Sequence, residues 1–152
     1  MLENIMGKFY IAYGSNLNLA QMAARCPSAR VYAKGVLNNW ELVYRGAESN
    51  SHATIERKTG STVPVLVWEI QPIDEYFLDI YEGYPHYYFK KDIMVHINGK
   101  KKKAMVYIID KRQPPGRPSA HYIETIRQGY IDNNLDIDIF KKSLKINSIE
   151  CA

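Results

Sequence analysis

The chain has 152 residues and a mass of 17.5 kDa, which is close to the usual size of one domain. Hydrophobic residues make up 46% and charged residues 24%, a globular balance that excludes collagen-like, coiled-coil and fully disordered chains. The net charge of +4 is mildly basic, and four lysines stand together at residues 100–103. We interpret this run as a solvated hairpin tip, because a nucleic-acid surface would spread basic residues along a face between stacking aromatics.

Cysteine and histidine give no sign of a metal centre. The two cysteines, Cys26 and Cys151, form no CxxC pair, and the histidines at 52, 86, 96 and 121 lack ligand spacing. Residues 1–8 do not resemble a secretion signal, and no apolar run reaches the ~20 residues that span a bilayer. We therefore expect a reduced, cytoplasmic, soluble protein without a metal or cofactor.

Apolar runs and turn residues predict the elements of the first half. Residues 9–13 indicate a buried strand that ends at Gly14, after which Asn18 can cap a short helix that stops before Pro27. Strands follow at residues 30–37, 40–45, 53–56 and 63–70, separated by turns at 38–39 and 59–61 and by a polar loop at 46–52. Residues 63–70 are the best candidate for a central strand, with Pro64 at its start rather than inside its ladder.

The second half predicts helices around a hairpin. Pro72 opens a helix that Gly83 ends, and its apolar residues fall on one side: Ile73, Phe77, Ile80 and Tyr81. Residues 87–97 and 104–110 form the hairpin, and an irregular connection at 111–118 follows. Ser119 caps a helix whose predicted inward residues are Tyr122, Ile123, Ile126 and Tyr130. A last amphipathic helix covers about residues 136–145.

These elements indicate the fold class. Six to seven strands and about four short helices, with the strands first, are typical of an α+β protein. We expect a single domain over residues 1–152, built as a small closed or half-closed sheet with helices outside.

Tyr13, Gly14, Ser15 and Asn16 stand between a predicted strand and a predicted helix. Glycine allows a tight turn there, and successive free N–H groups before a helix form an anion-binding concavity, to which Ser15 and Asn16 add side-chain donors. The loop is not a nucleotide P-loop, because no second glycine and no GK[ST] follow. A capped turn with no ligand is the competing interpretation.

Glu82 stands at the C-terminal end of a predicted helix, where the helix dipole disfavours a carboxylate. Asp79 lies one turn earlier, and aromatic residues surround Glu82 in the sequence. Helix end, like charge and apolar neighbours would each raise its pKa, which suits a general base near neutrality. The alternative is a solvated glutamate at a frayed end.

Other candidates for catalysis are weaker. We interpret Cys26 as a small packed thiol, and a triad built on Ser15 lacks the GxSxG elbow. His52, His86 and His121 fall in predicted loops or at a helix start, where surface or capping roles are usual.

Two segments resemble the γ-glutamylcyclotransferase (AIG2-like) family. Residues 11–17, Ile-Ala-Tyr-Gly-Ser-Asn-Leu, are similar to its substrate loop, and residues 78–84, Leu-Asp-Ile-Tyr-Glu-Gly-Tyr, to its catalytic segment. Further matches in the family's order extend the resemblance to roughly residues 9–135; they include 27–29, 53–55, 65–68, 107–109 and 114–115.

The resemblance implies a small mixed, largely antiparallel β-barrel with helices packed outside and a pocket at one rim. It implies a metal-independent reaction in which a γ-glutamyl amide becomes 5-oxoproline and a free amine or amino acid. Glu82 would be the general acid/base, while Tyr13, Gly14, Ser15, Asn16 and Leu17 bind the substrate's α-carboxylate and nearby oxygens. Tyr107 is expected to contact the substrate as well.

Several choices stay open. The leaving group could be an amino acid, an amine or a larger γ-glutamylated product, and which of Tyr87, Tyr88 and Phe89 lines the pocket is undecided. We expect a small-molecule γ-glutamyl partner, no nucleic acid, no membrane, and a monomer or homodimer. The alternatives are a non-catalytic γ-glutamyl binding module, a nucleic-acid-associated domain using residues 100–103, and hydrolysis by activated water.

Overall fold

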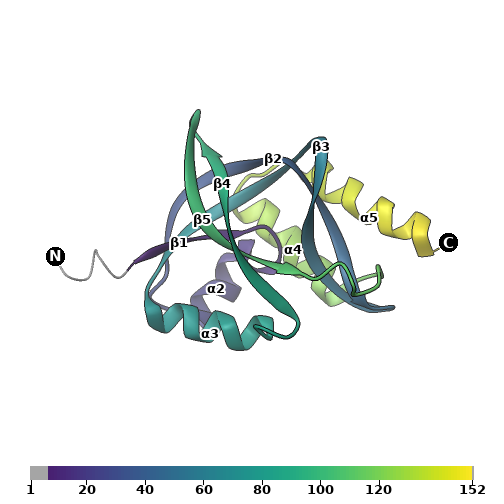
Figure 1. The fold of residues 1–152 in the computed structure, drawn as a ribbon, viewed down its shortest axis with the longest axis horizontal. Coiled ribbons are helices and arrows are strands. Elements are labelled where there is room, and N and C mark those ends of the chain that lie inside the picture. Colours follow the sequence, from purple (N-terminus) through teal and green to yellow (C-terminus); the bar gives the residue numbers. More distant parts are fainter. Residues whose placement is uncertain (1–6, 152) are drawn as a thin grey trace.

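A computed structural model gives the structure of residues 7–151, with side chains described for residues 7–146. Five strands form a closed barrel with the helices outside it (Figure 1). In chain order the elements are β1 Lys8–Ala12, the 3₁₀ turn η1 Ser15–Leu17, α2 Leu19–Arg25, β2 Arg30–Ala47, β3 Asn50–Ile70, α3 Pro72–Glu82, β4 Tyr88–Ile97, β5 Lys100–Ile109, α4 Ala120–Asp132 and α5 Ile137–Cys151.

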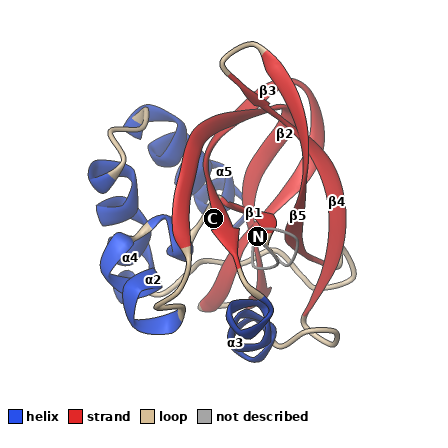
Figure 2. Cartoon of the chain, turned by 90° about the vertical axis from the view of Figure 1, so that its left-hand side faces the viewer, coloured by secondary structure: helices blue, strands red, loops and turns tan. Residues whose placement is uncertain are grey.

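The strand order around the barrel is β1-β3-β2-β4-β5. Every neighbouring pair is antiparallel except β1 and β5, which are parallel and pair Tyr10 with Met105. In Figures 1 and 2, α2 and α4 lie against one flank of the barrel and α3 lies below it. The predicted mixed, largely antiparallel barrel with outer helices is therefore confirmed.

The predicted count of six to seven strands is wrong, because β2 and β3 are long and continuous. Asn39 adopts a φ of 66° inside β2, where the pairing with β3 shifts register between Asn38 and Trp40. Gly60 takes a φ of 86° inside β3, and its N–H donates to Asn39 Oδ1 at 3.0 Å. The predicted turns at 38–39 and 59–61 are bends within the ladder, because a β-bulge accommodates a positive φ without ending a strand.

Three further boundaries differ from the prediction. The polar loop expected at 46–52 contracts to a tight turn, because β2 ends at Ala47 and β3 begins at Asn50. Pro64 pairs with Val36 inside the ladder rather than standing at a strand's start. β3 pairs with β1 only from Leu66 onward, so Pro64 has a neighbouring strand on one side, where a missing N–H is tolerated.

The four lysines at residues 100–103 lie in β5, and not at the hairpin tip as expected. The turn consists of Asn98 and Gly99, and the strand pairs Lys100 with Ile97 and Lys103 with Met94. Lys102 places its ammonium 4.3 Å from the centre of the Phe9 ring.

Two helices begin directly after the capping residues that the sequence predicted, Asn18 for α2 and Ser119 for α4. The Asn18 side chain accepts from the Gln21 N–H at 3.0 Å, and the Ser119 side chain accepts from the Tyr122 N–H at 3.2 Å. Tyr130 and Ile126 of α4 are buried against the barrel, as expected, and α5 extends beyond its predicted end at residue 145. Among the residues that the structure describes, no helix is long and apolar enough to cross a membrane.

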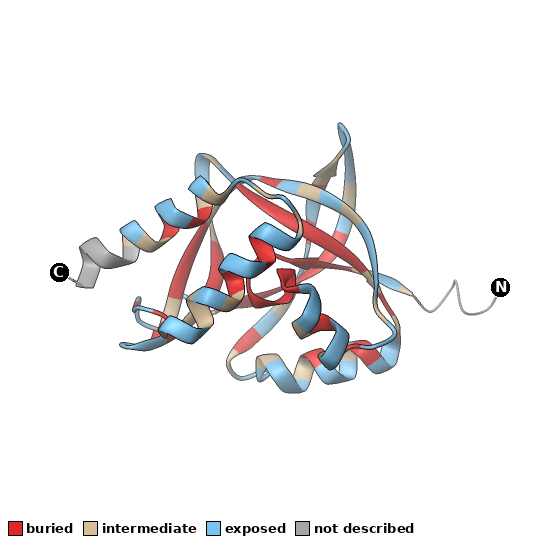
Figure 3. Ribbon diagram, turned by 180° about the vertical axis from the view of Figure 1, so that it is seen from behind, coloured by how far each residue is buried: buried red, intermediate tan, exposed pale blue. Residues whose placement is uncertain are grey.

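Most of α3 is exposed or half-buried (Figure 3), and several of its large apolar residues face solvent. Ile73 and Ile80 are 54% and 62% exposed, while the buried side chains of this helix are Asp74 and Leu78. α3 therefore covers the barrel with little apolar burial of its own.

Candidate active site

One pocket lies where the loop after β1 meets the C-terminal end of α3. Glu82 reaches it from α3, although 66 residues separate Glu82 from Asn16 in the chain. The pocket is small, about 20 Å³, and its wall is rich in tyrosine; the lining residues are Tyr10, Tyr13, Gly14, Ser15, Asn16, Ala53, Glu82, Tyr88, Tyr107 and Tyr122. The barrel thus brings the two segments that the sequence singled out to one place.

The loop that lines the pocket contains backbone N–H groups without a partner. η1 begins at Ser15, so the first N–H groups of this 3₁₀ turn have no carbonyl before them to bind. Neither the Ser15 nor the Asn16 amide donates to another residue within the described range 7–151. Two adjacent unpaired N–H groups favour an anionic ligand.

The Ser15 and Asn16 side chains, expected as donors to a ligand, make hydrogen bonds within the protein. Asn16 Nδ2 donates to the Tyr10 hydroxyl at 2.8 Å, while its Oδ1 accepts from Arg25. Trp68 Nε1 donates to the Asn16 carbonyl at 3.2 Å. Asn16 is therefore a brace for the loop, and the unpaired donors of the loop are its backbone N–H groups.

Gly14 keeps the backbone of the loop close to the pocket wall. Its φ of −128° lies outside the left-handed region, so the spacing to that wall is the feature that can be read directly from the structure. A Cβ at this position would lie 3.1 Å from the Ala53 Cβ and 3.7 Å from the Tyr122 hydroxyl, two groups of the pocket wall. Glycine keeps the backbone close to that wall.

Leu17 lies outside the pocket. Its side chain is fully buried, and its carbonyl accepts from Asn133 Nδ2 at 2.7 Å. Gly129 of α4 packs directly on Leu17, since a Cβ at residue 129 would lie 2.6 Å from the Leu17 Cβ. Leu17 anchors the loop to α4, and the structure does not bring its side chain together with the other candidate residues.

Glu82 is half-buried and makes no hydrogen bond or ion pair within the described part of the chain. Gly83 ends α3 in the left-handed conformation, with φ 68°, and so directs the chain away immediately after Glu82. Burial raises the pKa of Glu82 to about 8, and the charge of Arg25 opposes this shift. The sequence predicted that the charge of Asp79 would also raise the pKa of Glu82, and this is wrong. The Asp79 carboxylate instead contacts Lys90 and Tyr107.

The hydroxyl groups of three pocket tyrosines form hydrogen bonds with backbone groups. Tyr13 donates to the Tyr107 carbonyl at 2.7 Å, Tyr88 donates to the Ala53 carbonyl at 2.7 Å, and Tyr122 accepts from the Ala53 N–H at 3.1 Å. Burial, helped by the Glu82 charge, raises the pKa of each of these hydroxyls. These rings form a fixed, neutral wall.

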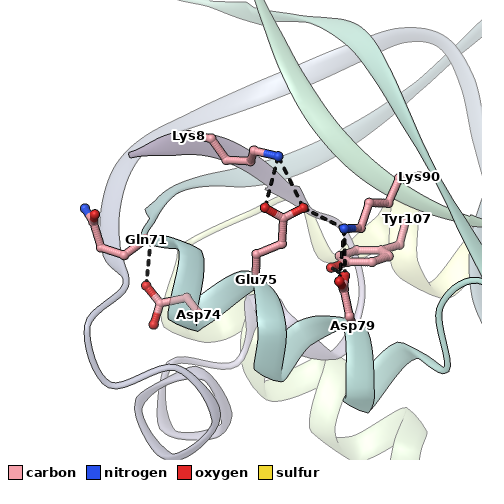
Figure 4. Close-up of polar contacts among 7 residues, drawn as sticks. All are labelled: Lys8, Gln71, Asp74, Glu75, Asp79, Lys90 and Tyr107. Carbon is pink, nitrogen blue, oxygen red and sulfur yellow. Dashed lines mark hydrogen bonds and ion pairs between the residues drawn. The ribbon is translucent and has the colours of Figure 1, made fainter. Parts of the chain in front are cut away.

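Tyr107 lines the pocket, and its hydroxyl is bound to a residue outside the pocket lining. The hydroxyl donates to Asp79 Oδ1 at 2.6 Å (Figure 4). Burial and the Asp79 hydrogen bond raise the pKa of Tyr107 far above its ordinary value. Tyr107 therefore offers a ring to a ligand and no proton.

A second cavity, about 120 Å³, shares Glu82 with the first. It resolves the open choice at residues 87–89: Tyr87 and Tyr88 line it, whereas Phe89 is partly exposed and lines neither cavity. The other lining residues are His52, Tyr81 and Tyr122.

Sequence reasoning missed His52 and Tyr81. His52 lies in β3 rather than a loop, its Nδ1 is 3.0 Å from the Tyr87 hydroxyl, and burial lowers its pKa. The Tyr81 hydroxyl is 3.0 Å from Ser15 Oγ, and its ring stacks under the Arg25 guanidinium. The position of Tyr81 next to Glu82 in the sequence could have marked Tyr81 as a site residue. The contact of Tyr81 with the loop, however, depends on how α3 packs against the barrel.

The residues that could hold a metal do not gather. Within the described residues, no three side chains of His, Cys, Asp or Glu come together as ligands. Cys26 is buried and free, and its thiol donates to the Asp74 carbonyl, as expected for a packed thiol.

Comparison with known proteins identifies relatives of this chain. The sequence profile of the family "Gamma-glutamyl cyclotransferase, AIG2-like" matches residues 10–125. A sequence search of curated proteins finds no match.

Similar solved structures include one described as a gamma-glutamyl cyclotransferase, with 27% identity and a TM-score of 0.82 over 91% of this chain and 86% of that one. An uncharacterised human protein matches with 27% identity and a TM-score of 0.82 over 92% and 87% of the two chains. A yeast gamma-glutamyl cyclotransferase described as specific to glutathione matches with 10% identity, a TM-score of 0.67, and coverage of 94% and 96%. This last likeness concerns the fold alone.

Proposed function

The chain belongs to the γ-glutamyl cyclotransferase, AIG2-like family, and we propose that it converts a small γ-glutamyl compound into 5-oxoproline and a free amine, with Glu82 as general acid/base. The observation that carries the proposal is the pairing of two features in one pocket. A half-buried carboxyl without a protein partner shares a pocket with a loop whose Ser15 and Asn16 N–H groups are unpaired.

In the proposed binding mode, the substrate's α-carboxylate accepts from the Ser15 and Asn16 amides. The first cavity is too small for a γ-glutamyl group, so the substrate extends into the second, which shares Glu82, Tyr88 and Tyr122 with it. Tyr81, which bonds to Ser15 at the side of the loop, has to rotate to widen the entrance. The neutral tyrosine wall fixes the chain of the substrate in a folded shape.

The proposed chemistry needs one proton-transfer group and no protein nucleophile. Glu82 takes a proton from the substrate's α-ammonium, and the freed amine nitrogen attacks the γ-carbonyl carbon of the same molecule. A new C–N bond closes the five-membered ring, and the ring nitrogen releases its surplus proton to solvent. The bond to the leaving nitrogen breaks as Glu82 returns its proton to that nitrogen. A carboxyl whose pKa is about 8 is matched to both transfers, since it holds a proton nearly as tightly as the amine does.

The test is detection of 5-oxoproline by mass spectrometry from γ-glutamyl amino acids, γ-glutamyl amines and glutathione. Wild type is compared with Glu82→Gln, which keeps the size of the side chain and removes its proton transfer. Glu124→Gln is the matched control, because Glu124 is exposed on α4 and pairs with Arg127. We expect product from wild type and the control, and at least a 100-fold loss in Glu82→Gln.

The outcomes separate the alternatives. Release of glutamate in place of 5-oxoproline would indicate hydrolysis by water, and near-normal turnover in Glu82→Gln would remove Glu82 from its role. If no compound gives product but some raise the melting temperature, the protein is a binding module on the same scaffold.

A further inference from the structure

α3 carries Glu82, yet apolar packing does little to orient it. Its buried side chains are Asp74 and Leu78, and three of its large apolar residues face solvent: Ile73, Phe77 and Ile80. A helix normally docks through its apolar stripe, which supplies most of its tertiary stability. The orientation of α3, and with it the depth of Glu82, must depend on other contacts.

Polar contacts attach the first turn of α3 to the rest of the protein. The Asp74 carboxylate accepts from Ser28 Oγ at 2.6 Å and from the Gln71 N–H at 2.8 Å. Glu75, one residue later, pairs with Lys8 of β1 at 3.0 Å and with Lys90 of β4 at 2.6 Å (Figure 4). These contacts hold the beginning of the helix, about two turns before Glu82.

Asp79 makes the corresponding attachment one turn before Glu82. Its Oδ1 accepts from the Tyr107 hydroxyl of β5 at 2.6 Å and lies 2.9 Å from Lys90 Nζ. Figure 4 shows Lys90 between Glu75 and Asp79, so one ammonium joins two turns of α3 to β4. The side chains of Lys90 and Asp79 are 21% and 28% exposed, which places this network at the edge of the protein and not in bulk solvent.

Tyr107 connects the same attachment to the substrate loop. Its hydroxyl binds Asp79 on α3, and its backbone carbonyl accepts from the Tyr13 hydroxyl at 2.7 Å. A single β5 residue therefore links the helix that carries Glu82 with the strand end from which Gly14 and Ser15 follow. The distance between the carboxyl and the loop amides depends on this link.

We propose that Asp79, held by Lys90, is a positioning residue whose bond to the Tyr107 hydroxyl sets the place of Glu82 against the substrate loop. This inference rests on the proposed function for its catalytic meaning, since a displacement of about 1 Å costs ~100-fold in rate. Asp79 contacts no substrate in this scheme. Its negative charge makes the carboxylate a strong acceptor for the hydrogen bond from the Tyr107 hydroxyl.

The test uses variants that change the link while leaving the pocket wall in place. Tyr107→Phe removes only the hydroxyl, and Asp79→Ala removes the acceptor. Each is expected to lower kcat by about 10- to 100-fold with a smaller change in KM, and the double variant should lose no more than either single one. Asp79→Asn retains an oxygen that can accept from Tyr107 but loses the ion pair with Lys90, so its rate should lie between those of Asp79→Ala and wild type. Glu124→Gln again serves as the control.

A readout independent of turnover is the titration of Glu82 itself. In protein carrying ¹³C-labelled glutamate, the Glu82 carboxyl signal is the one absent from Glu82→Gln. In Tyr107→Phe, which changes no charge at neutral pH, the Glu82 pKa should fall from about 8 toward the ordinary 4.5 as the carboxyl gains water.

The two proposals fail in different ways. Absence of 5-oxoproline from wild type would overturn the function, while a lowered Glu82 pKa in Tyr107→Phe would still support the positioning role. An unchanged Glu82 titration in a folded Tyr107→Phe variant would overturn that role, as would rate losses that add in the double variant.

Discussion

Glu82 titrates above the ordinary range of a carboxyl because burial penalises its ionised form. In the unfolded chain its pKa lies near 4.5, and in the folded protein near 8. Between these values the folded state keeps a proton that the unfolded state has released. Stability contributed by this group is therefore lost as the pH rises through the interval.

This linkage predicts how Glu82→Gln changes the melting temperature. The variant should gain stability relative to wild type as the pH rises from 4.5 to about 8, because glutamine has no charge to bury. Calorimetric scans across that range measure the difference. In Glu124→Gln no such gain is expected, since Arg127 lowers the pKa of Glu124 and the sign is reversed. A constant difference between Glu82→Gln and wild type would show that Glu82 titrates normally.

Gly14 gives a second prediction for a single residue. In Gly14→Val the added carbons would meet Ala53 and Tyr122 on the pocket wall. We expect affinity for a γ-glutamyl compound to fall by about tenfold or more, which is ~1.4 kcal/mol. Calorimetric titration measures the affinity, and circular dichroism checks that the variant is folded. Unchanged affinity in folded protein would place the carboxylate site elsewhere.

At the scale of secondary-structure elements, the contact of α4 with η1 holds the loop at residues 14–18 in place. Gly129 lets the helix backbone approach Leu17 and Asn18, and the Asn133 side chain adds a hydrogen bond to the Leu17 carbonyl. The loop at residues 14–18 is thus held between the barrel and a helix more than a hundred residues later.

Gly129→Ala should force this contact apart. Its Cβ would lie 2.6 Å from the Leu17 Cβ and 2.8 Å from the Asn18 backbone nitrogen, neither of which can move alone. We expect a loss of about 1–3 kcal/mol in the free energy of unfolding, measured with denaturant. Gln128→Ala, an exposed neighbour on the same helix, should change it by less than about 0.5 kcal/mol. Equal effects of the two substitutions would argue against a close helix–loop contact.

At the scale of the whole molecule, the barrel and α3 differ in how they are held. Tyr10 and Ile11 of β1, and Val65 and Val67 of β3, are buried, whereas α3 depends on Glu75, Asp79 and their partners. Local opening of such an element requires little exposure of apolar surface.

Native-state hydrogen exchange should therefore show α3 amides exchanging faster than those of β1 and β3. Lys90→Met, which removes the cation shared by Glu75 and Asp79, should accelerate exchange in α3 and leave the barrel strands nearly unchanged. Uniform acceleration over the whole chain would mean that α3 opens only with global unfolding.

Much of the fold was predictable because local signals agreed with each other. Asn18, Ser119 and Gly83 mark helix ends by backbone chemistry that does not depend on distant residues. The predicted number of strands was wrong because the same local sequence signal can either end a strand or bend it. Asn39 and Gly60 could each end a strand or bend it, and their mutual hydrogen bond across two long strands decides for bending.

The sequence by itself determined the fold class, the capped starts of α2 and α4, the end of α3 at Gly83 and the two segments that meet in the pocket, because resemblance and capping are read along the chain. Only the tertiary structure decided that Asn16 braces the loop, that Leu17 lies under α4, and that Asp79 faces Lys90 and Tyr107 instead of Glu82. The physical reason is that closing the barrel sets which side chains meet. Burial and charge partners, and therefore the raised pKa of Glu82, arise only after that closure.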